Sequence, residues 1–337
     1  KMKKIKEIIS QYENISLMIE KKRDDWKKIY DKLDYQSIDC IYDLVNYRVS
    51  YLKSNQAKNL SLIFYLNGKP IAIAPIIFYK QKNNKDFSFI GLFPPSFDSE
   101  IGKKTKFDIF EKYLNIIYNI KKNFSVQIKF NISCFNNNDY EFLSFLYDKN
   151  YKIIDVNEFL LVQNKNSFEK IFSDFRKSYK PLINSNIKNF KPEIMNYKNF
   201  DENIWSNFRK MHRKESGKIT RISETWEHQK QALENNNAIL VYIKKNSKFL
   251  GFSFFYYTRD ESIYASSVLD GKIKNQKTPV GHLIQYEAIN FFVKKRIKNY
   301  KIARVEKISK NSIKEKNILK FKQGFANSFV KEFVLKI

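Results

Sequence analysis

The apolar pattern in the C-terminal part of the chain predicts three consecutive strands. Apolar side chains dominate each run, and short polar turns separate the runs, which is how strands of an antiparallel meander are bounded. The strands are expected at 237–245, 249–258 and 263–269. A polar loop follows at 270–277.

Residues 278–296 carry the apolar spacing of a helix. Thr278 is the expected N-cap, and Pro279 is expected at the first helical position, where its missing N–H is not needed. The pattern then predicts a strand at 300–305, a helix at 311–320 and a last strand at 329–337.

The N-terminal half repeats this order of elements. A hairpin is expected over 60–80, because Asn67-Gly68 is a strong two-residue turn signal. The pattern continues with a strand, a loop, a helix, a strand, a helix and a strand at 87–93, 94–104, 107–122, 125–133, 139–149 and 151–163. The closing strands even share NEFLLVQ at 157–163 against KEFVLKI at 331–337.

This duplication predicts an α/β protein with mixed sheets (α+β), built from two tandem units. The first unit is expected at 1–163 with a helical lead-in. The second is expected at 164–337, where a helical connector at about 165–235 precedes the repeated elements.

Composition adds that the chain is globular and basic. Hydrophobic residues make up 43% of 337 residues, and the formal net charge is +27. The lysines are spread along the whole chain, so the charge fits either the codon bias of an AT-rich genome or an anionic partner such as a nucleotide or tRNA. No apolar run reaches the roughly 20 residues that span a bilayer. With no signal peptide visible, we expect a cytoplasmic protein without a membrane span.

Several chemistries lack a motif in this sequence. Cys40 and Cys134 predict neither a disulfide framework nor a metal site, and no histidine stands near them in sequence. No glycine-rich phosphate loop follows a strand. Enzyme classes that depend on such motifs are therefore not indicated.

The repeated unit resembles the fold of the GNAT acyltransferases, and two such units resemble the FemABX and FemAB-like branch. The segments that carry the resemblance are FRKSYKPLIN, MHRKESGKITRISETWEHQ, the YAS of 264–266, TPVGHLIQYEAI and FKQGFA. Members of this branch include aminoacyl-tRNA-dependent transferases of peptidoglycan synthesis and proteins associated with surface amino-sugar pathways. The resemblance implies acyl or aminoacyl transfer to an amine, and it covers residues 160–337 better than the N-terminal half.

The resemblance places the donor where the strand at 263–269 separates from the strand at 300–305, and at the N-terminus of the helix between these two strands. A helix N-terminus attracts phosphates through free N–H groups and the helix dipole. Donor contacts are therefore expected from Thr278, Val280, Gly281, His282 and Lys277. Only one glycine is present there, however, and Pro279 removes a donor, which departs from the loop that holds coenzyme A. The donor is thus either an acyl-CoA such as acetyl-CoA or an aminoacyl-tRNA, and no metal is implied.

The acceptor side is expected at residues 205–226. Trp205, Phe208, Met211, His212 and Glu215 follow helical spacing, with Gly217 as the C-terminal cap. The plain interpretation is a helix whose core face ends in a partnered histidine and a solvated glutamate. The functional one makes His212 the general base.

In the functional interpretation Glu215 holds the amine or hydroxyl of the acceptor, and Arg221 binds a carboxylate or phosphate. Glu224 and Trp226 open the next helix, which Ser223 is expected to cap. Trp226 either packs in the core or stacks on a sugar.

The general acid is left open by the sequence. Many GNAT enzymes place a tyrosine on the helix after the fourth strand, but this helix carries NILKFKQ. Tyr264 and Tyr286 are the substitutes that the sequence offers.

Three functions follow from these interpretations. The first is an N-acyltransferase that moves an acyl group from acyl-CoA to an amino-sugar or nucleotide-sugar precursor of a surface glycan. The second is an aminoacyl-tRNA-dependent transferase that acts on a cell-wall precursor. The third is a non-catalytic double-GNAT module that binds nucleic acid or a protein.

Overall fold

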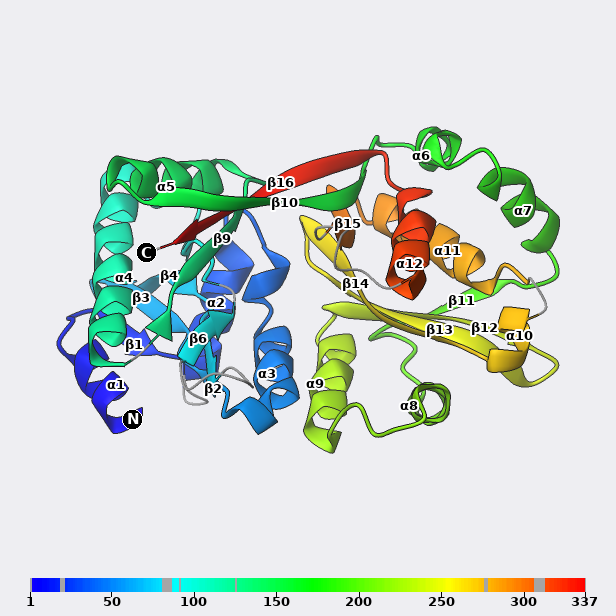
Figure 1. Cartoon of the computed structure of the whole chain (residues 1–337), viewed down its shortest axis with the longest axis horizontal. Coiled ribbons are helices and arrows are strands. Elements are labelled where there is room, and N and C mark those ends of the chain that lie inside the picture. The colour runs from blue at the N-terminus through cyan, green and yellow to red at the C-terminus, as the bar shows by residue number, and fades with distance from the viewer. Residues whose placement is uncertain are drawn as a thin grey trace. The chain divides into compact units, whose positions relative to one another are not determined.

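The computed structural model describes residues 2–18, 22–80, 87–90, 92–124, 126–275, 278–305 and 313–336. The chain divides into two compact units (Figure 1). Unit 1 comprises residues 1–157 together with 331–337, and unit 2 comprises 158–330. The last strand thus returns to the first unit, an exchange that element order along the chain did not reveal.

Unit 2 is built on a mixed sheet with the strand order β11, β12, β13, β14, β15, β10. All neighbours are antiparallel except β14 and β15, which are parallel. The bounds are Pro192–Met195 (β11), Ala238–Lys245 (β12), Lys248–Tyr257 (β13), Glu261–Leu269 (β14), Asn299–Val305 (β15) and Lys152–Gln163 (β10), of which 158–163 belong to this unit.

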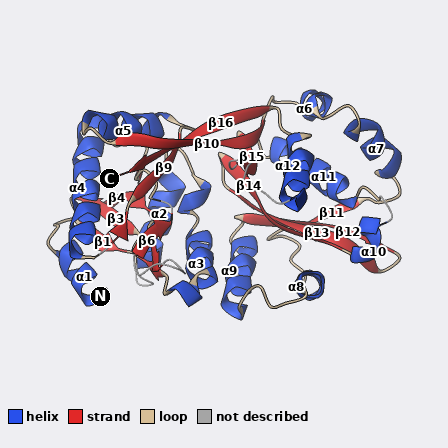
Figure 2. Ribbon diagram, in the orientation of Figure 1, coloured by secondary structure: helices blue, strands red, loops and turns tan. Residues whose placement is uncertain are grey.

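Helices cover both faces of this sheet (Figure 2). One face carries α6 (Phe168–Asp174), α7 (Tyr179–Asn186), α11 (Val280–Lys294) and α12 (Ile313–Gln323). The other carries α8 (Glu202–Ser216) and α9 (Ser223–Glu234), and α10 (Gly271–Asn275) follows β14. Strand β13 explains this arrangement, because it presents Phe255 to the first face and Phe252 and Phe254 to the second.

The second meander therefore matches its prediction strand for strand, and three local expectations are corrected. The expected loop at 270–277 begins with the short helix α10, because the Asp270 side chain accepts the backbone N–H of Lys272 at 2.8 Å. The connector also contains β11, an edge strand that begins with a proline. Ser223 is the first residue of α9 and Ile222 its N-cap, without a side-chain cap.

Unit 1 contains the repeated elements and the helical lead-in. Its helices are α1 (Met2–Ser10), α2 (Arg23–Lys32), α3 (Tyr42–Tyr51), α4 (Lys103–Asn123) and α5 (Asn137–Asp148). Its strands are β1 (Ile15–Leu17), β2 (Lys58–Asn59), β3 (Leu62–Leu66), β4 (Lys69–Ala74), β5 (Ile77–Lys80), β6 (Phe87–Ile90), β7 (Ser96–Phe97), β8 (Val126–Gln127), β9 (Lys129–Ser133) and the end of β16 (Ser328–Lys336).

The predicted N-terminal hairpin is confirmed at its turn and corrected in its arms. Asn67 and Gly68 both have positive φ, as a tight hairpin turn requires. The first arm is β3, and the second arm is broken into β4 and β5 at Pro75, which has no N–H to donate; β2 precedes the expected span and pairs with β5. The Ser61 hydroxyl accepts the N–H of Ile76 at 3.0 Å and bridges the break.

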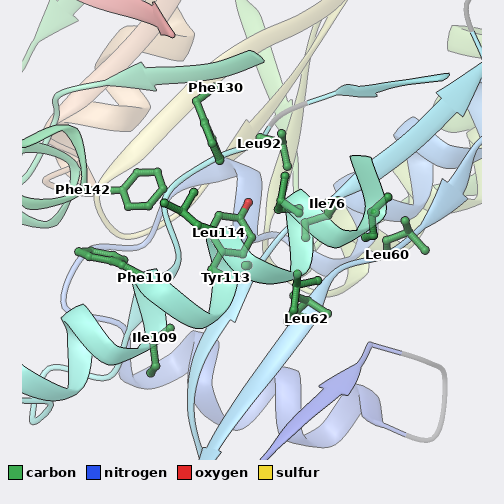
Figure 3. Packing of buried hydrophobic residues seen from close by; sticks show 14 of the residues in the cluster. Leu60, Leu62, Ile76, Leu92, Ile109, Phe110, Tyr113, Leu114, Phe130 and Phe142 are labelled. Carbon is green, nitrogen blue, oxygen red and sulfur yellow. The ribbon is translucent and has the colours of Figure 1, made fainter. Parts of the chain in front are cut away.

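Aromatic side chains from α4, α5 and β9 fill the core of unit 1 (Figure 3). Phe110, Tyr113, Phe130 and Phe142 are all fully buried. In four pairs among them the ring centroids lie 4.8 to 6.1 Å apart, and all four pairs are tilted or edge-to-face, the arrangement that aromatic quadrupoles favour. Unit 1 is thus held together mainly by packing.

Candidate functional site

The expected separation of two parallel strands in unit 2 is present. Strands β14 and β15 pair at only three positions, ending at Ile263 and Lys301, although β14 continues to Leu269. The register between β13 and β14 shifts because Ala265 is an extra residue in β14. Such a bulge bends its strand. Within the described residues, the backbone of β14 beyond Ile263 has no strand partner on the side of β15.

Tyr264 lies where the two strands separate. Its ring packs on Phe255 at a centroid distance of 5.4 Å. Burial raises the pKa of the Tyr264 hydroxyl, while hydrogen bonding with Ser267, Ser253 and Gln285 opposes the rise. Tyr264 is therefore a neutral hydroxyl among polar neighbours.

Lys322 on α12 is a functional candidate that the sequence argument missed. Its Nζ lies 4.8 Å from the centroid of the Tyr264 ring. Burial lowers the pKa of the Lys322 amine. No carboxylate of the described residues forms an ion pair with it. The signal was available, because Lys322 stands in NILKFKQ, the segment in which a tyrosine was sought.

Helix α7 fixes the C-terminal end of α12 and thereby the position of Lys322. Arg176, which precedes α7, donates to the carbonyl of Lys320 at 3.1 Å, and the Tyr179 hydroxyl donates to the carbonyl of Phe321 at 3.2 Å. A Cβ on Gly324 would lie 2.2 Å from the Tyr179 ring. Glycine is therefore needed for this close approach.

The first turn of α11 differs from the expected phosphate site. Pro279 is the N-cap and Val280 the first helical residue, so Thr278 does not cap the helix. The N-cap lies one residue later than expected because the backbone N–H of Val280 donates to the carbonyl of Thr278 at 2.9 Å. Val280 is fully buried, and a Cβ on Gly281 would lie 3.5 Å from the Phe321 ring.

His282 is enclosed by aromatic rings. Tyr179 and Phe321 lie at centroid distances of 4.4 and 4.9 Å, both edge-to-face. Burial, with a smaller effect of the Arg176 charge, lowers the pKa of His282 to about 4. The imidazole is neutral at physiological pH and offers no positive charge to a phosphate.

Two further candidates remain, Tyr286 as a general acid or substrate contact and Lys277 as a donor contact. Tyr286 packs edge-to-face on Phe168 at 4.8 Å, away from the strand separation. Lys277 lies outside the described residues.

Some of the acceptor-side candidates line a pocket, and the others do not. A cavity of about 350 Å³ lies between α8, the loop 217–222 and α9. His212, Arg221 and Trp226 line it, but Glu215 and Glu224 do not. Its other lining residues are Ser206, Arg209, Lys210, Arg213, Lys218, Ile219, Thr220 and Ser223.

His212 contacts Trp226 edge-to-face at a centroid distance of 5.4 Å. Burial and then the Arg221 charge lower the pKa of His212 below its usual 6.5. The imidazole is therefore neutral at physiological pH, the form that can accept a proton.

Arg221 is held in place from two directions. It donates to Gln229 Oε1 at 2.9 Å, and its guanidinium lies 4.8 Å from the centroid of the Trp226 ring. Trp226 is 8% exposed and also packs on Phe208, so its main contacts are with the core.

Glu215 does not line the pocket and instead contacts the backbone of α10. Its Oε1 accepts the backbone N–H of Gly271 at 3.1 Å and so ties the end of α8 to α10. Gly217 ends α8 with φ +66°, as predicted, and Asp201 caps its start. Glu224 is exposed and accepts a hydrogen bond from Ser223.

The pocket and the Lys322–Tyr264 pair lie on opposite faces of the sheet. The pocket is on the face of α8 and α9, and Tyr264 packs with the core under α11. Helix α8 packs along β14. A reacting carbonyl held beside β14, where β15 diverges, could thus be approached from one face and protonated from the other.

Among the described residues, no helix is long and apolar enough to cross a bilayer, and no three His, Cys, Asp or Glu side chains are grouped for a metal ion.

Comparison with known proteins places the fold. The sequence matches no family model and no curated protein. FemX superposes with a TM-score of 0.64 at 11% identity, over 96% of this chain and 97% of FemX. The C-terminal domain of a putative lysylphosphatidylglycerol synthetase from Agrobacterium fabrum gives 0.58 at 10% identity, over 93% and 91%. L-PGS from Bacillus licheniformis gives 0.52 at 10%, over 85% and 89%. The chain therefore shares the fold of FemX and of these two synthetase structures, in agreement with the FemABX resemblance of its sequence.

Proposed function

We propose that this chain is a transferase that moves an acyl or aminoacyl group from an activated ester or thioester to an amine. The observation that carries the proposal is the edge of β14 beside Lys322, which has no strand partner among the described residues. Backbone N–H groups at such an edge stabilise the oxyanion that forms when the amine attacks the carbonyl. A positive Lys322 adds to that stabilisation.

The proton balance assigns a role to each side of the site. The acceptor enters as an ammonium ion and becomes an amide nitrogen, so it loses two protons. Neutral His212 takes the first proton, and the amine is then free to attack. His212 later releases this proton to solvent. Lys322 donates a proton to the leaving oxygen or sulfur as the tetrahedral intermediate collapses, and the second proton lost by the nitrogen restores the charge of Lys322.

An aminoacyl-tRNA ester is the donor we favour. The first turn of α11 is covered by side chains, since Val280 is buried and Phe321 lies over Gly281. His282 is neutral, so it would not attract a pyrophosphate. This turn is where the GNAT resemblance places coenzyme A. The chain's net charge of +27 suits an RNA donor.

Acyl-CoA is the second candidate, with an amino sugar or nucleotide sugar as acceptor. The divergence of β14 from β15 favours it, because the GNAT resemblance implies that a thioester is held there.

Donor binding separates the two candidates. We expect coenzyme A at millimolar concentration to leave the melting temperature unchanged, whereas a ligand that binds the native state would raise it. Charged tRNA should bind with an affinity that falls steeply with salt, and its labelled amino acid should pass to a cell-wall precursor. A coenzyme A shift with thiol release on UDP- or CMP-linked amino sugars would instead establish the second candidate.

His212→Ala should lower turnover at least about tenfold without lowering the melting temperature. The wild-type rate should fall on the acid side only below pH 6.5, because activity is lost as His212 becomes protonated and its pKa is lowered. That acid limb should disappear in the variant. His228→Ala is the matched control, since His228 lies on α9 outside the pocket. A wild-type rate in His212→Ala would remove the base from the mechanism.

A further inference from the structure

A buried polar cluster lies under α11, close to the point where β14 and β15 separate. Gln285 of α11 is 1% exposed, and Tyr300 of β15 and Ser253 of β13 are each 2% exposed. The surroundings are apolar, since the rings of Phe255 and Phe292 pack on Tyr300 at centroid distances of 6.0 and 5.1 Å. A buried amide in such surroundings costs free energy unless its oxygen and its nitrogen have partners.

Gln285 has hydrogen-bond partners on both of the separating strands. The Tyr300 hydroxyl of β15 donates to Gln285 Oε1 at 2.7 Å. Gln285 is also hydrogen-bonded with the Tyr264 hydroxyl of β14. Because an amide accepts at its oxygen and donates from its nitrogen, Gln285 Nε2 is left to donate to Tyr264. The other partners of the Tyr264 hydroxyl are Ser253 and Ser267, whose own hydroxyls lie 2.9 Å apart. One side chain of α11 thus connects β14 with β15.

The connection lies at the last paired position of the two strands. Strands β14 and β15 pair for the last time at Ile263 and Lys301. Tyr264 is the next residue along β14, and Tyr300 directly precedes Lys301 on β15. Beyond this point β14 has no strand partner on the side of β15 among the described residues. Gln285 therefore limits how far the strands can separate where the proposed reaction takes place.

The Tyr264 ring held in this way is the surface on which Lys322 lies. Lys322 Nζ is 4.8 Å from the centroid of that ring. A ring that is hydrogen-bonded at its hydroxyl keeps its orientation, and a cation attracted to its face is placed with it. Placement matters for the rate, because a shift of about 1 Å in a reacting group can cost roughly a hundredfold.

We propose that Gln285 is a positioning residue for acyl transfer. Its amide joins Tyr300 to Tyr264 across the separating strands, and the Tyr264 ring held in this way places the amine of Lys322 at the reacting carbonyl. The inference rests on the proposed function for the transfer step, but the placement of Lys322 can be measured without turnover.

Gln285→Met keeps the length of the side chain and removes both hydrogen bonds. We expect kcat to fall by about tenfold to a hundredfold. The KM for the acceptor should change less than about twofold, because the candidate acceptor pocket lies on the opposite face of the sheet. Asn290→Leu is the matched control, since it replaces a half-exposed amide of the same helix with an apolar side chain of similar size. It should change neither quantity.

Tyr300→Phe tests whether Gln285 acts through this contact. The variant keeps the packed ring and removes only the hydroxyl that donates to Gln285. By itself it should lower kcat about threefold to tenfold. Combined with Gln285→Met it should add little, because two changes to one interaction are not additive. Losses that add fully would show that the two side chains act separately and would overturn the proposed connection.

The amine of Lys322 gives a readout that needs no turnover. Tyr264 is the titratable side chain in contact with it, and burial rather than a neighbouring charge lowers its pKa. Competitive labelling of lysines with acetic anhydride, followed by mass spectrometry, measures that pKa. In Gln285→Met the loosened Tyr264 ring should admit water, so the pKa of Lys322 should rise toward its usual 10.5. Asn290→Leu should leave it unchanged.

The outcomes separate this proposal from the proposed function. Wild-type values of kcat and of the Lys322 pKa in Gln285→Met would overturn the positioning role. A lower kcat with an unchanged Lys322 pKa would overturn it too, since the loss would then arise elsewhere. If Gln285→Met does not fold, Tyr300→Phe carries the same two measurements with smaller expected effects. A raised Lys322 pKa in a protein that transfers no acyl group would refute the proposed function and leave the connection between the strands standing.

Discussion

Lys322→Met should lower turnover by about a hundredfold or more, the usual loss when one group that stabilises a developing oxyanion is removed. Lys322 lies beside Tyr264 where β14 and β15 diverge, and its amine is the only side-chain cation that we place at the reacting carbonyl. Steady-state kinetics with a saturating acceptor would measure the effect. The loss should appear in kcat rather than in KM, because the interaction strengthens only as the oxyanion forms.

Stability should change in the opposite direction. A buried amine without a carboxylate partner among the described residues is costly, so replacing it with methionine should leave the melting temperature unchanged or raise it. Lys320→Met is the matched control on the same helix, because that side chain is exposed and should have no effect on either quantity. An unchanged kcat in Lys322→Met would show that the amine plays no part in catalysis.

The wild-type pH profile should reflect the same group. Burial lowers the pKa of Lys322 below its usual 10.5, so activity that needs the protonated amine should be lost as the pH rises through this lowered value. The alkaline limb should disappear, together with most of the rate, in Lys322→Met.

Gly324→Ala should destabilise the protein by about 2–3 kcal/mol, which corresponds to a fall in melting temperature of roughly 5–10 °C. The new Cβ would lie 2.2 Å from the Tyr179 ring, which is itself packed against His282 and Phe325 and has no free space to enter. Thermal unfolding would measure this loss. Displacement of Tyr179 should also release the carbonyl of Phe321 and reduce turnover through Lys322.

Gly281→Ala is the matched comparison. Its Cβ would meet Phe321 at 3.5 Å, an ordinary contact, and alanine favours a helix over glycine. We expect unchanged or slightly higher stability. Equal destabilisation by both substitutions would contradict the close approach of Tyr179 as the reason for Gly324.

The sequence was sufficient for the second meander and for several turns and helix ends, because local chemistry fixes them. Positive φ at Asn67 and Gly68 forms the predicted hairpin turn, and Gly217 ends α8 in the left-handed conformation. The periodicity of the second meander predicted β12, β13 and β14 nearly to the residue. At the start of α11 the predicted N-cap, Thr278, is wrong by one residue, because the carbonyl of Thr278 accepts the backbone N–H of Val280.

Which side chains meet was decided by the tertiary structure alone. Helical spacing placed His212 and Glu215 on one face. In the structure Glu215 accepts the backbone N–H of Gly271 outside the cavity, whereas His212 lines the cavity. Lys322 meets Tyr264 only because α12 folds back over the end of β15, a contact between residues far apart in the chain. The sequence by itself determined most of the elements and the order in which they repeat, and its family resemblance pointed to the stretch that lines the pocket. Packing over long separations determined which charges are buried, and burial sets the pKa values on which the proposed chemistry depends.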